Sequence, residues 1–232
     1  MKNHLKRIPA PKTWSIDRKI RTFIVRPTHS GHPFNHGLPL GVIIRDCLKL
    51  TSTMREARKL LHTNEVLVDG FRRKEYGFQV GLFDIVTIKK LNKSYTVTFD
   101  RKGRLIVEEI PAKESEQKIC KIIGKTILPM GKIQYNLSDG KNIISDKKIK
   151  IGDSLVLGLP KLDIKEVLEL KPGAFIFLVK GKHQGSSGKL KEVKGEEAVY
   201  TADGEDIDTA KAYLFVVKEI KKQKTGAKPV EA

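Results

Sequence analysis

The stretch TSTMREARKLLHTNEVLVDGFRRK, residues 51–74, decides the fold because it combines a helix start, a helix and a hairpin turn. Thr53 and Glu56 have the spacing of a capping box, in which a hydroxyl and a carboxylate satisfy the first free N–H groups of a helix. Residues 66–68 are apolar as in a strand, and Asp69-Gly70 is typical of a hairpin turn. The predicted helix buries one apolar side, made of Met54, Ala57, Leu60 and Leu61.

The same stretch predicts a basic surface. The helix face opposite to the apolar one gathers Arg55, Arg58, Lys59 and His62. The segment after the turn adds Arg72, Arg73 and Lys74. Upstream, an apolar pattern with helical spacing over residues 40–48 predicts a further short helix, and residues 86–90 predict a second strand. Residues 39–90 are therefore expected to form a compact unit in which a cationic helix face adjoins a cationic turn, a combination that suits RNA.

The composition also indicates a polyanionic partner. The 232 residues carry a formal net charge of +18, and 39% of them are hydrophobic, which is enough for real cores. Residues 1–38 are the most basic part, with eight basic and one acidic side chain. No apolar run approaches the roughly 18 residues of a membrane span, and the charged N-terminus lacks the apolar region of a signal peptide. Cys47 and Cys120 are expected to be reduced core residues of a cytoplasmic protein.

The two ends of the chain show no regular periodicity. Residues 1–38 are rich in proline and glycine and predict a basic extended arm that orders only against its partner. Trp14 could anchor this arm to the folded body or stack on a base, and we favour the anchor. Residues 218–232 are polar and Lys-rich, and we expect a basic flexible tail there.

The remainder is predicted to be β structure. Residues 91–168 alternate in polarity at 95–99 and 133–137 and contain several turn signals, whereas 116–123 fit either a strand or a short helix. Residues 169–217 begin with a strand, turn through a glycine-rich loop at 181–188 and resume a strand at Leu190. The acidic stretch 196–208 is expected to face solvent or a protein neighbour, and its carboxylates at 203, 205, 206 and 208 are expected in a turn between strands.

Patterns that could indicate catalysis or metal binding lack supporting context. His29, His32 and His36 lie in the Pro/Gly-rich segment, with no cysteine nearby and no helix to orient them. The sequence GSSGK at 185–189 is not a phosphate-binding loop, because Leu190 stands where a Ser or Thr is required and a strand follows. We therefore expect no enzyme activity, no metal and no cofactor.

Several of these motifs resemble one family, in order along the chain. TSTMREARKLLHTNEVLVDGFRR is similar to the S4-type RNA-binding domain, and HLKRIPAPKTWSIDRK resembles the opening of the archaeal and eukaryotic ribosomal S4e family. The pieces KICKI, YNLSDGKN and GDSL resemble the central domain of that family. PGAFIFLVKGKHQGSSGKLKEV resembles a KOW motif, the strand-loop-strand element of small SH3-like barrels. Ser186-Ser187 departs from that motif, which leaves RNA contact through this loop open.

The resemblance implies an α+β multidomain architecture, archaeal in type. Its parts would be a basic extended N-terminal arm (1–38), a small αβ S4-type RNA-binding domain (39–90), a central β domain (91–168), a C-terminal SH3-like β-barrel with the KOW motif (169–217) and the tail (218–232). The implied function is that of a structural constituent of the small ribosomal subunit, on cytoplasmic ribosomes. The implied partners are small-subunit rRNA and neighbouring small-subunit ribosomal proteins, with no membrane and no small-molecule substrate.

The rRNA contacts expected from the basic residues and the resemblance lie in three groups. The N-terminal group is Lys6, Arg7, Lys12, Arg18, Lys19, Arg21, Arg26 and His32. The group in the S4-type unit is Arg45, Arg55, Arg58, Lys59, His62, Arg72, Arg73 and Lys74. The group at the KOW loop is Lys182, His183 and Lys189. Two alternatives stay open: an RNA-binding transcription or stress factor, and an RNA-modifying enzyme.

Overall fold

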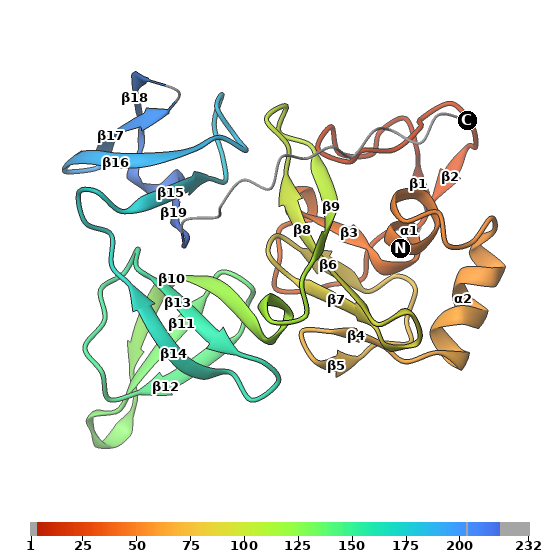
Figure 1. Ribbon diagram of the computed structural model, residues 1–232, viewed down its shortest axis with the longest axis horizontal. Coiled ribbons are helices and arrows are strands. Elements are labelled where there is room, and N and C mark those ends of the chain that lie inside the picture. Colours follow the sequence, from red (N-terminus) through yellow and green to blue (C-terminus); the bar gives the residue numbers. More distant parts are fainter. Residues whose placement is uncertain (1–3, 203, 219–232) are drawn as a thin grey trace.

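The computed structural model describes residues 4–202 and 204–218, and it shows a mostly-β protein with few helices (Figure 1). Within the described residues, three antiparallel sheets of five strands follow one another along the chain, and two smaller sheets have two strands each. The first large sheet lies with the helices and the N-terminal segment on one side of the molecule, and the other two sheets lie on the opposite side (Figure 1).

The first large sheet has the strand order β5-β4-β7-β8-β9. Its strands are β4 (Val66–Val68), β5 (Phe71–Arg72), β7 (Ile85–Ile88), β8 (Lys93–Phe99) and β9 (Leu105–Ile110). Asp69 and Gly70 form the tight turn between β4 and β5, with φ angles of +52° and +82°. β7 pairs with β8, so the sheet continues through the boundary expected between residues 90 and 91. The alternating strand at 95–99 is therefore part of the first sheet and not of the second.

Two short helical segments pack against the first sheet: α1 (Leu40–Val42) and α2 (Met54–Thr63). Residues Ile43–Cys47 continue α1 as a π-helix, in which the N–H of Leu48 donates to the carbonyl of Ile43 at 2.8 Å. The predicted helix over 40–48 therefore exists, but its second half is wound more widely than an α-helix. In α2 the side chains of Ala57 and Leu61 are buried, whereas those of Met54 and Leu60 are buried only in part.

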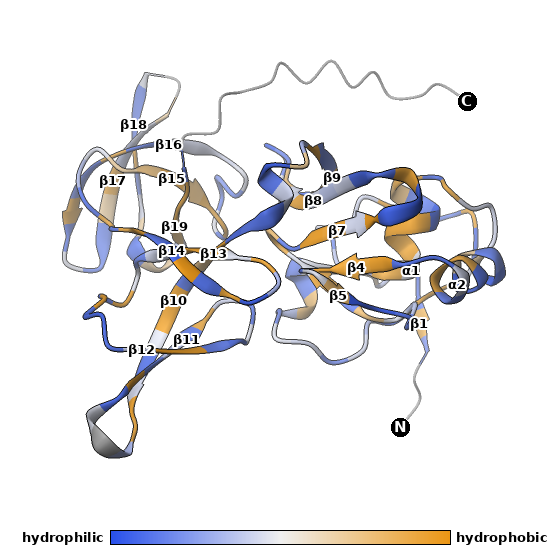
Figure 2. Ribbon diagram, turned by 60° about the horizontal axis from the view of Figure 1, so that its bottom comes forward, coloured by the Kyte–Doolittle hydropathy of each residue, from blue (hydrophilic) through white to orange (hydrophobic). Residues whose placement is uncertain are grey.

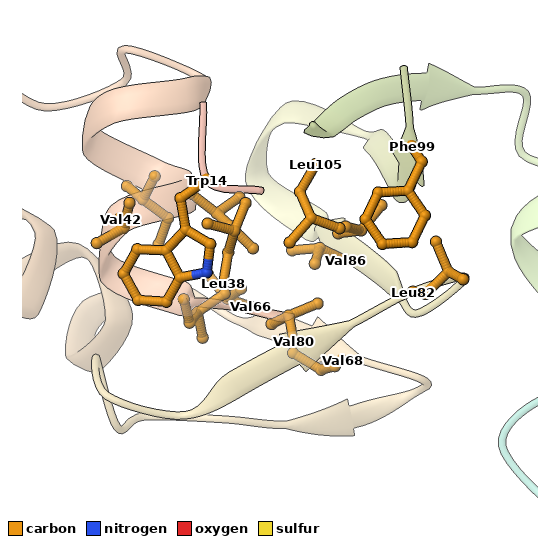
Figure 3. Close-up of a cluster of buried hydrophobic side chains, with 14 of the residues drawn as sticks. Trp14, Leu38, Val42, Val66, Val68, Val80, Leu82, Val86, Phe99 and Leu105 are labelled. Atoms are coloured by element: carbon orange, nitrogen blue, oxygen red, sulfur yellow. The ribbon is translucent and has the colours of Figure 1, made fainter. Parts of the chain in front are cut away.

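The N-terminal segment packs on this unit and completes its core. β1 (Leu5–Lys6) pairs with β2 (Phe23–Ile24), and β3 (Gly37–Pro39) pairs with β6 (Gln79–Gly81). Trp14 is only 2% exposed and lies beside Val42 and Leu38 in the core (Figure 3), which makes it an anchor. Residues 4–38 are thus folded on the body and do not form the free arm that we expected. The burial of their few apolar side chains is sufficient to hold the segment in place.

The second large sheet has the strand order β12-β11-β10-β13-β14. Its strands are β10 (Gln117–Ile127), β11 (Ile133–Leu137), β12 (Asn142–Ser145), β13 (Ser154–Gly158) and β14 (Asp163–Leu168). The ambiguous residues 116–123 therefore fall mostly in a strand. β10 pairs with β13 along its first half and with β11 along its second, with an irregularity between Ile122 and Gly124. Because of this change of partner, β10 joins the β13-β14 part of the curved sheet to the β11-β12 part.

The third large sheet has the strand order β18-β17-β16-β15-β19. Its strands are β15 (Phe175–Leu178), β16 (Ser187–Lys194), β17 (Glu197–Ala202), β18 (Glu205–Ala210) and β19 (Leu214–Val216). The acidic residues from 205 to 208 lie in β18, an edge strand, and not in a turn as expected. Single 3-10 turns complete the described structure at Phe34–His36, Lys89–Leu91, Glu114–Glu116, Pro129–Gly131 and Lys211–Tyr213. The predicted tail lies largely outside the described residues.

A buried ion cluster joins the first sheet to the second. Lys118 of β10 is 2% exposed, and its Nζ donates to Asp69 at 2.7 Å, to Asp84 at 2.5 Å and to Asp139 at 2.9 Å. Lys141 adds a second cation at the edge of the cluster, 2.8 Å from Asp69. Burial alone would raise the pKa of Asp84 and Asp139, but the charge of Lys118 keeps both pKa values below their ordinary value.

We predict that this cluster makes the protein sensitive to acid. Because the folded-state pKa values of Asp84 and Asp139 lie below the ordinary 3.8, their stabilising contribution is complete above about pH 4 and is lost as the pH falls further. The melting temperature measured by circular dichroism should therefore decrease steadily from pH 4 to pH 2.5. A melting temperature that stays constant over that range would contradict this account of the cluster.

Candidate nucleic-acid interface

The N-terminus of α2 is fixed by its own side chains, which sets the direction of its basic face. Thr53 Oγ1 accepts a hydrogen bond from the N–H of Glu56 at 3.2 Å. The carboxylate of Glu56 accepts in turn from the N–H of Ser52 at 3.0 Å, one residue before the helix cap. The bond from Ser52 is the largest cause of a lowered pKa of Glu56. The predicted capping box is therefore confirmed, with the carboxylate reaching one residue further back than in the usual pattern.

The outward face of α2 carries the four basic residues expected there. The side chains of Arg55, Arg58, Lys59 and His62 are all exposed. Figure 2 shows the hydrophilic character of α2 in contrast to the hydrophobic strand β4. The guanidinium of Arg58 lies over the ring of Tyr76, 3.9 Å from its centroid. A cation held over a ring in this way keeps a defined position while its outer edge stays open to a ligand.

The β5 segment adjoins this face and extends it. Arg72 is exposed, and its Nη2 donates to the carbonyl of His62 at 3.1 Å, which ties β5 to the end of α2. Arg73 is half-buried and stacks on Phe78, 4.5 Å from the ring centroid. Lys74 is exposed. The bond of Arg72 to the end of α2 therefore joins the two basic segments, and we call the seven basic residues predicted for α2 and for 72–74 the α2–β5 surface.

A second basic region lies where the N-terminal segment meets the body. It is a cleft of about 1,420 Å³, lined by seven Arg or Lys side chains and two acidic ones. Lys12 and Arg21, both exposed, were predicted as contacts. Lys49 and Arg104 also line it and were missed by the sequence analysis. They come from segments that only the fold places beside residues 7–21, so no local pattern marks them. The exposed side chains of Ile8 and Ile20 interrupt the positive charge.

Among the predicted contacts, Arg7, Arg18, Arg45 and His32 have polar partners within the protein, as Arg72 does. Arg7 is 3% exposed, and its guanidinium donates to the carbonyl of Asp17 and approaches Asp46. Arg45 pairs with both oxygens of Asp46 at 2.9 and 2.8 Å. Arg18 donates to four carbonyl oxygens, those of Arg7, Ile8, Ala10 and Pro11.

His32 also has its partner within the protein. Its Nε2 lies 3.1 Å from Asp84, and only 9% of its side chain is exposed. The polar groups of Arg7, Arg18 and His32 thus help to order the N-terminal segment, and Arg45 holds Asp46, which is also a partner of Arg7. Contact of these four residues with rRNA stays a prediction. The other N-terminal basic residues that were predicted are exposed, namely Lys6, Lys12, Lys19, Arg21 and Arg26.

The glycine-rich loop between β15 and β16 lies far from the α2–β5 surface (Figure 1). The side chains of Lys182, His183 and Lys189 are exposed, as predicted for phosphate contacts. The end of the loop packs closely on the turn between β8 and β9. The approach is so close that a Cβ added to Gly185 would lie 2.1 Å from the carbonyl oxygen of Asp100. Gly185 also has a φ of +88°, so that this close approach requires glycine. The loop is held at its base and open at its tip.

Other kinds of site find little support in the described part of the chain. Both cysteines are free thiols, and burial raises the pKa of Cys47 to about 12, which makes it unreactive. Among residues 4–202 and 204–218, no group of three His, Cys, Asp or Glu side chains is placed to hold a metal ion. The described helices are all too short or too polar to span a membrane.

A cationic helix face and a basic cleft on a mostly-β protein are typical of the class of nucleic-acid-binding proteins. Residues 91–164 match the family model described as ribosomal family S4e, and residues 1–34 match the RS4NT domain. The small ribosomal subunit protein eS4 of Archaeoglobus fulgidus is 41% identical over 98% of this chain and 96% of its own length. The chain belongs to the ribosomal S4e family.

Further comparisons agree with this assignment. The small ribosomal subunit protein eS4 of Methanocaldococcus jannaschii is 39% identical over 93% of this chain and 94% of its own length. The crystal structure of the 30S ribosomal protein S4e from Thermoplasma acidophilum matches with a TM-score of 0.68 and 31% identity, over 78% of this chain and 95% of that one. The fold is therefore that of this family, mostly β and divided into several sheets.

Proposed function

We propose that the protein is a structural constituent of the small ribosomal subunit that binds rRNA and supports subunit assembly. The observation that carries the proposal is the α2–β5 surface, where seven basic residues from two elements lie together on a capped helix and a tight turn. The relatives named as small-subunit proteins support the ribosome as its location. Ribosomal proteins of this family act by binding and not by catalysis, and cytoplasmic ribosomes would be its site of action.

In the proposed domain organisation, each large sheet forms one domain. Residues up to 110, with the first sheet, would form an enlarged S4-type RNA-binding unit. The second sheet would be the central domain, and the third would be the SH3-like barrel that carries the KOW loop. The proposed rRNA contacts are the exposed basic residues of the N-terminal segment, the α2–β5 surface and the KOW loop, together with Lys49 and Arg104. Neighbouring ribosomal proteins would contact the remaining faces.

The physical basis of the proposed binding is neutralisation of phosphates. Each Lys or Arg that contacts a phosphate releases counterions, so the affinity falls with salt in proportion to the number of contacts. Because the α2–β5 side chains come from rigid elements, they present a fixed pattern of charge. Such a pattern selects the shape of a folded RNA, since helical RNA is recognised mainly through its backbone and shallow groove.

We predict that the triple change Arg55→Ala, Lys59→Ala, Lys74→Ala weakens binding to small-subunit rRNA by about 10²-fold near 0.15 M salt. The slope of log affinity against log salt should become shallower by about three, because about one contact is lost per residue. The binding is measured by filter retention at four salt concentrations. All three side chains are exposed, so the melting temperature should stay unchanged.

A matched control removes the same charge elsewhere. Lys147, Lys148 and Lys161 are exposed lysines of the second sheet unit and lie outside the proposed surface. Their replacement by alanine should change the affinity much less than the first triple change does. If both triple variants lose the same affinity, the protein binds through its net charge alone and the assignment of the α2–β5 surface fails.

A further inference from the structure

A small cavity opens beside β5, where three parts of the chain meet. Its volume is about 190 Å³. The N-terminal segment contributes Ser30 and His32, and residues 71–78 contribute Phe71, Arg73 and Phe78. The rest of the lining includes Lys141 and the buried ion cluster of Lys118 with its three aspartates. The space equals that of about six water molecules at about 30 Å³ each. It can hold one aromatic heterocycle, and it is too small for a helix or a strand of a partner.

The rim of this cavity carries an aromatic ring that the fold leaves open. Phe71 is 46% exposed, although it lies in the short strand β5 next to buried Val68. A single exposed apolar side chain is common on protein surfaces and by itself indicates nothing. Phe71, however, stands directly before the basic run Arg72, Arg73 and Lys74 and forms part of the cavity wall. A ring placed between cationic side chains is the arrangement that stacks a base while its phosphates are neutralised.

The inner wall of the cavity is polar and rigidly held. Gln79 is fixed from both ends, because Ser30 donates to its Oε1 at 3.1 Å and its Nε2 donates to the carbonyl of Pro33 at 2.9 Å. The stacked guanidinium of Arg73 keeps a buried Nε that has no hydrogen-bond partner among the described residues. Because a buried donor without a partner is costly, a ligand with an acceptor atom would gain by entering here.

We propose that Phe71 stacks on an unpaired base of the small-subunit rRNA and that the cavity receives this base. This inference rests on the proposed function and names the kind of RNA element that the α2–β5 surface recognises: a loop or bulge with one extruded nucleotide. The stacked ring supplies affinity for any base, and the polar wall meets the base edge. The contact adds recognition that the phosphate contacts of α2 do not provide, since those read only the backbone.

The test uses the full chain and a small-subunit rRNA transcript. Phe71→Ala and Phe71→Leu should each weaken binding by about 10-fold, as the loss of one base stack does. Phe71→Trp should bind as the wild type does, because it keeps a stacking ring. The salt slope should be the same in all four proteins, since no charge changes. Base-specific probing with dimethyl sulfate, kethoxal and a carbodiimide should show one unpaired base that the wild type protects and Phe71→Ala does not.

The outcomes separate this inference from the proposed function. If the wild type does not bind the rRNA, the proposed function fails, and this inference fails with it. If the wild type binds and Phe71→Leu binds equally well with the same bases protected, stacking is absent and only the inference is overturned. If Phe71→Ala binds rRNA normally but enters subunits poorly, the ring contacts a neighbouring protein, and the inference is again overturned. Phe71 is exposed, so all three variants should fold.

Discussion

Replacing Lys118 with methionine should lower the free energy of unfolding by about 3–5 kcal/mol, the usual cost of removing one partner from a buried ion pair. Lys118 is the common partner of Asp69, Asp84 and Asp139, all of which are buried. Methionine fills a similar volume without a charge, so the loss reports on electrostatics and not on packing. The measurement is urea-induced unfolding at pH 7, followed by circular dichroism.

Two controls make the prediction for Lys118 specific. Lys141→Met should lower the free energy of unfolding by clearly less, because the side chain of Lys141 is 28% exposed. Its two carboxylate partners also remain paired with Lys118 in that variant. The destabilisation of Lys118→Met should also be smaller at pH 3 than at pH 7, since protonated carboxyl groups no longer need a counter-charge. A loss below about 1 kcal/mol at pH 7 would show that the cluster contributes little and that the two sheets are held together by other contacts.

Replacing Trp14 with alanine should also lower the free energy of unfolding by about 3–5 kcal/mol, as for other large buried aromatic residues. Trp14 is buried with Ala10 and Ile24 in the core that the N-terminal segment shares with the first sheet. The backbone of the same segment is bound to the sheet, because the N–H of Leu105 donates to the carbonyl of Thr13 at 2.6 Å. The loss of the ring should therefore loosen the segment and the basic cleft that it lines.

The measurement is urea unfolding together with limited proteolysis of the N-terminal segment. Trp14→Phe serves as the control and should lower the free energy of unfolding by less, because phenylalanine keeps most of the buried apolar area of the tryptophan side chain. It also removes an indole N–H that is buried without a partner among the described residues. If Trp14→Ala leaves both the stability and the protease resistance of residues 4–38 unchanged, the segment is not an integral part of the fold.

The features predicted correctly from the sequence are those that local chemistry determines. The cap at Thr53, the basic and apolar faces of α2 and the Asp69-Gly70 turn depend on residues a few positions apart. The strands of the β regions are visible in the sequence as alternating apolar and polar residues, because every second side chain of a strand faces a core. The α2–β5 surface could be predicted because both of its parts lie in one short stretch, 55–74.

The features that were missed depend on residues far apart in the chain. The ion cluster joins positions 69, 84, 118, 139 and 141, and each of these looks like an ordinary turn or surface residue in the sequence. The internal partners of Arg7 and Arg18 were missed for a related reason, because composition gives the sign of a charge and does not show which groups lie next to it. Arg45 was missed as well, although Asp46 follows it directly and offered a local sign of an ion pair. The π-helix at 43–47 left no sequence signal that we recognise.

The central claim is that the protein is an integral part of the small ribosomal subunit. It is tested most directly by sedimentation of an extract from cells that contain it, through a high-salt sucrose gradient, with quantitative mass spectrometry of each fraction. We expect the protein to migrate with the small subunits at one copy per subunit. Recovery at the top of the gradient, or far below one copy per subunit, would contradict it and would favour an RNA-binding transcription or stress factor.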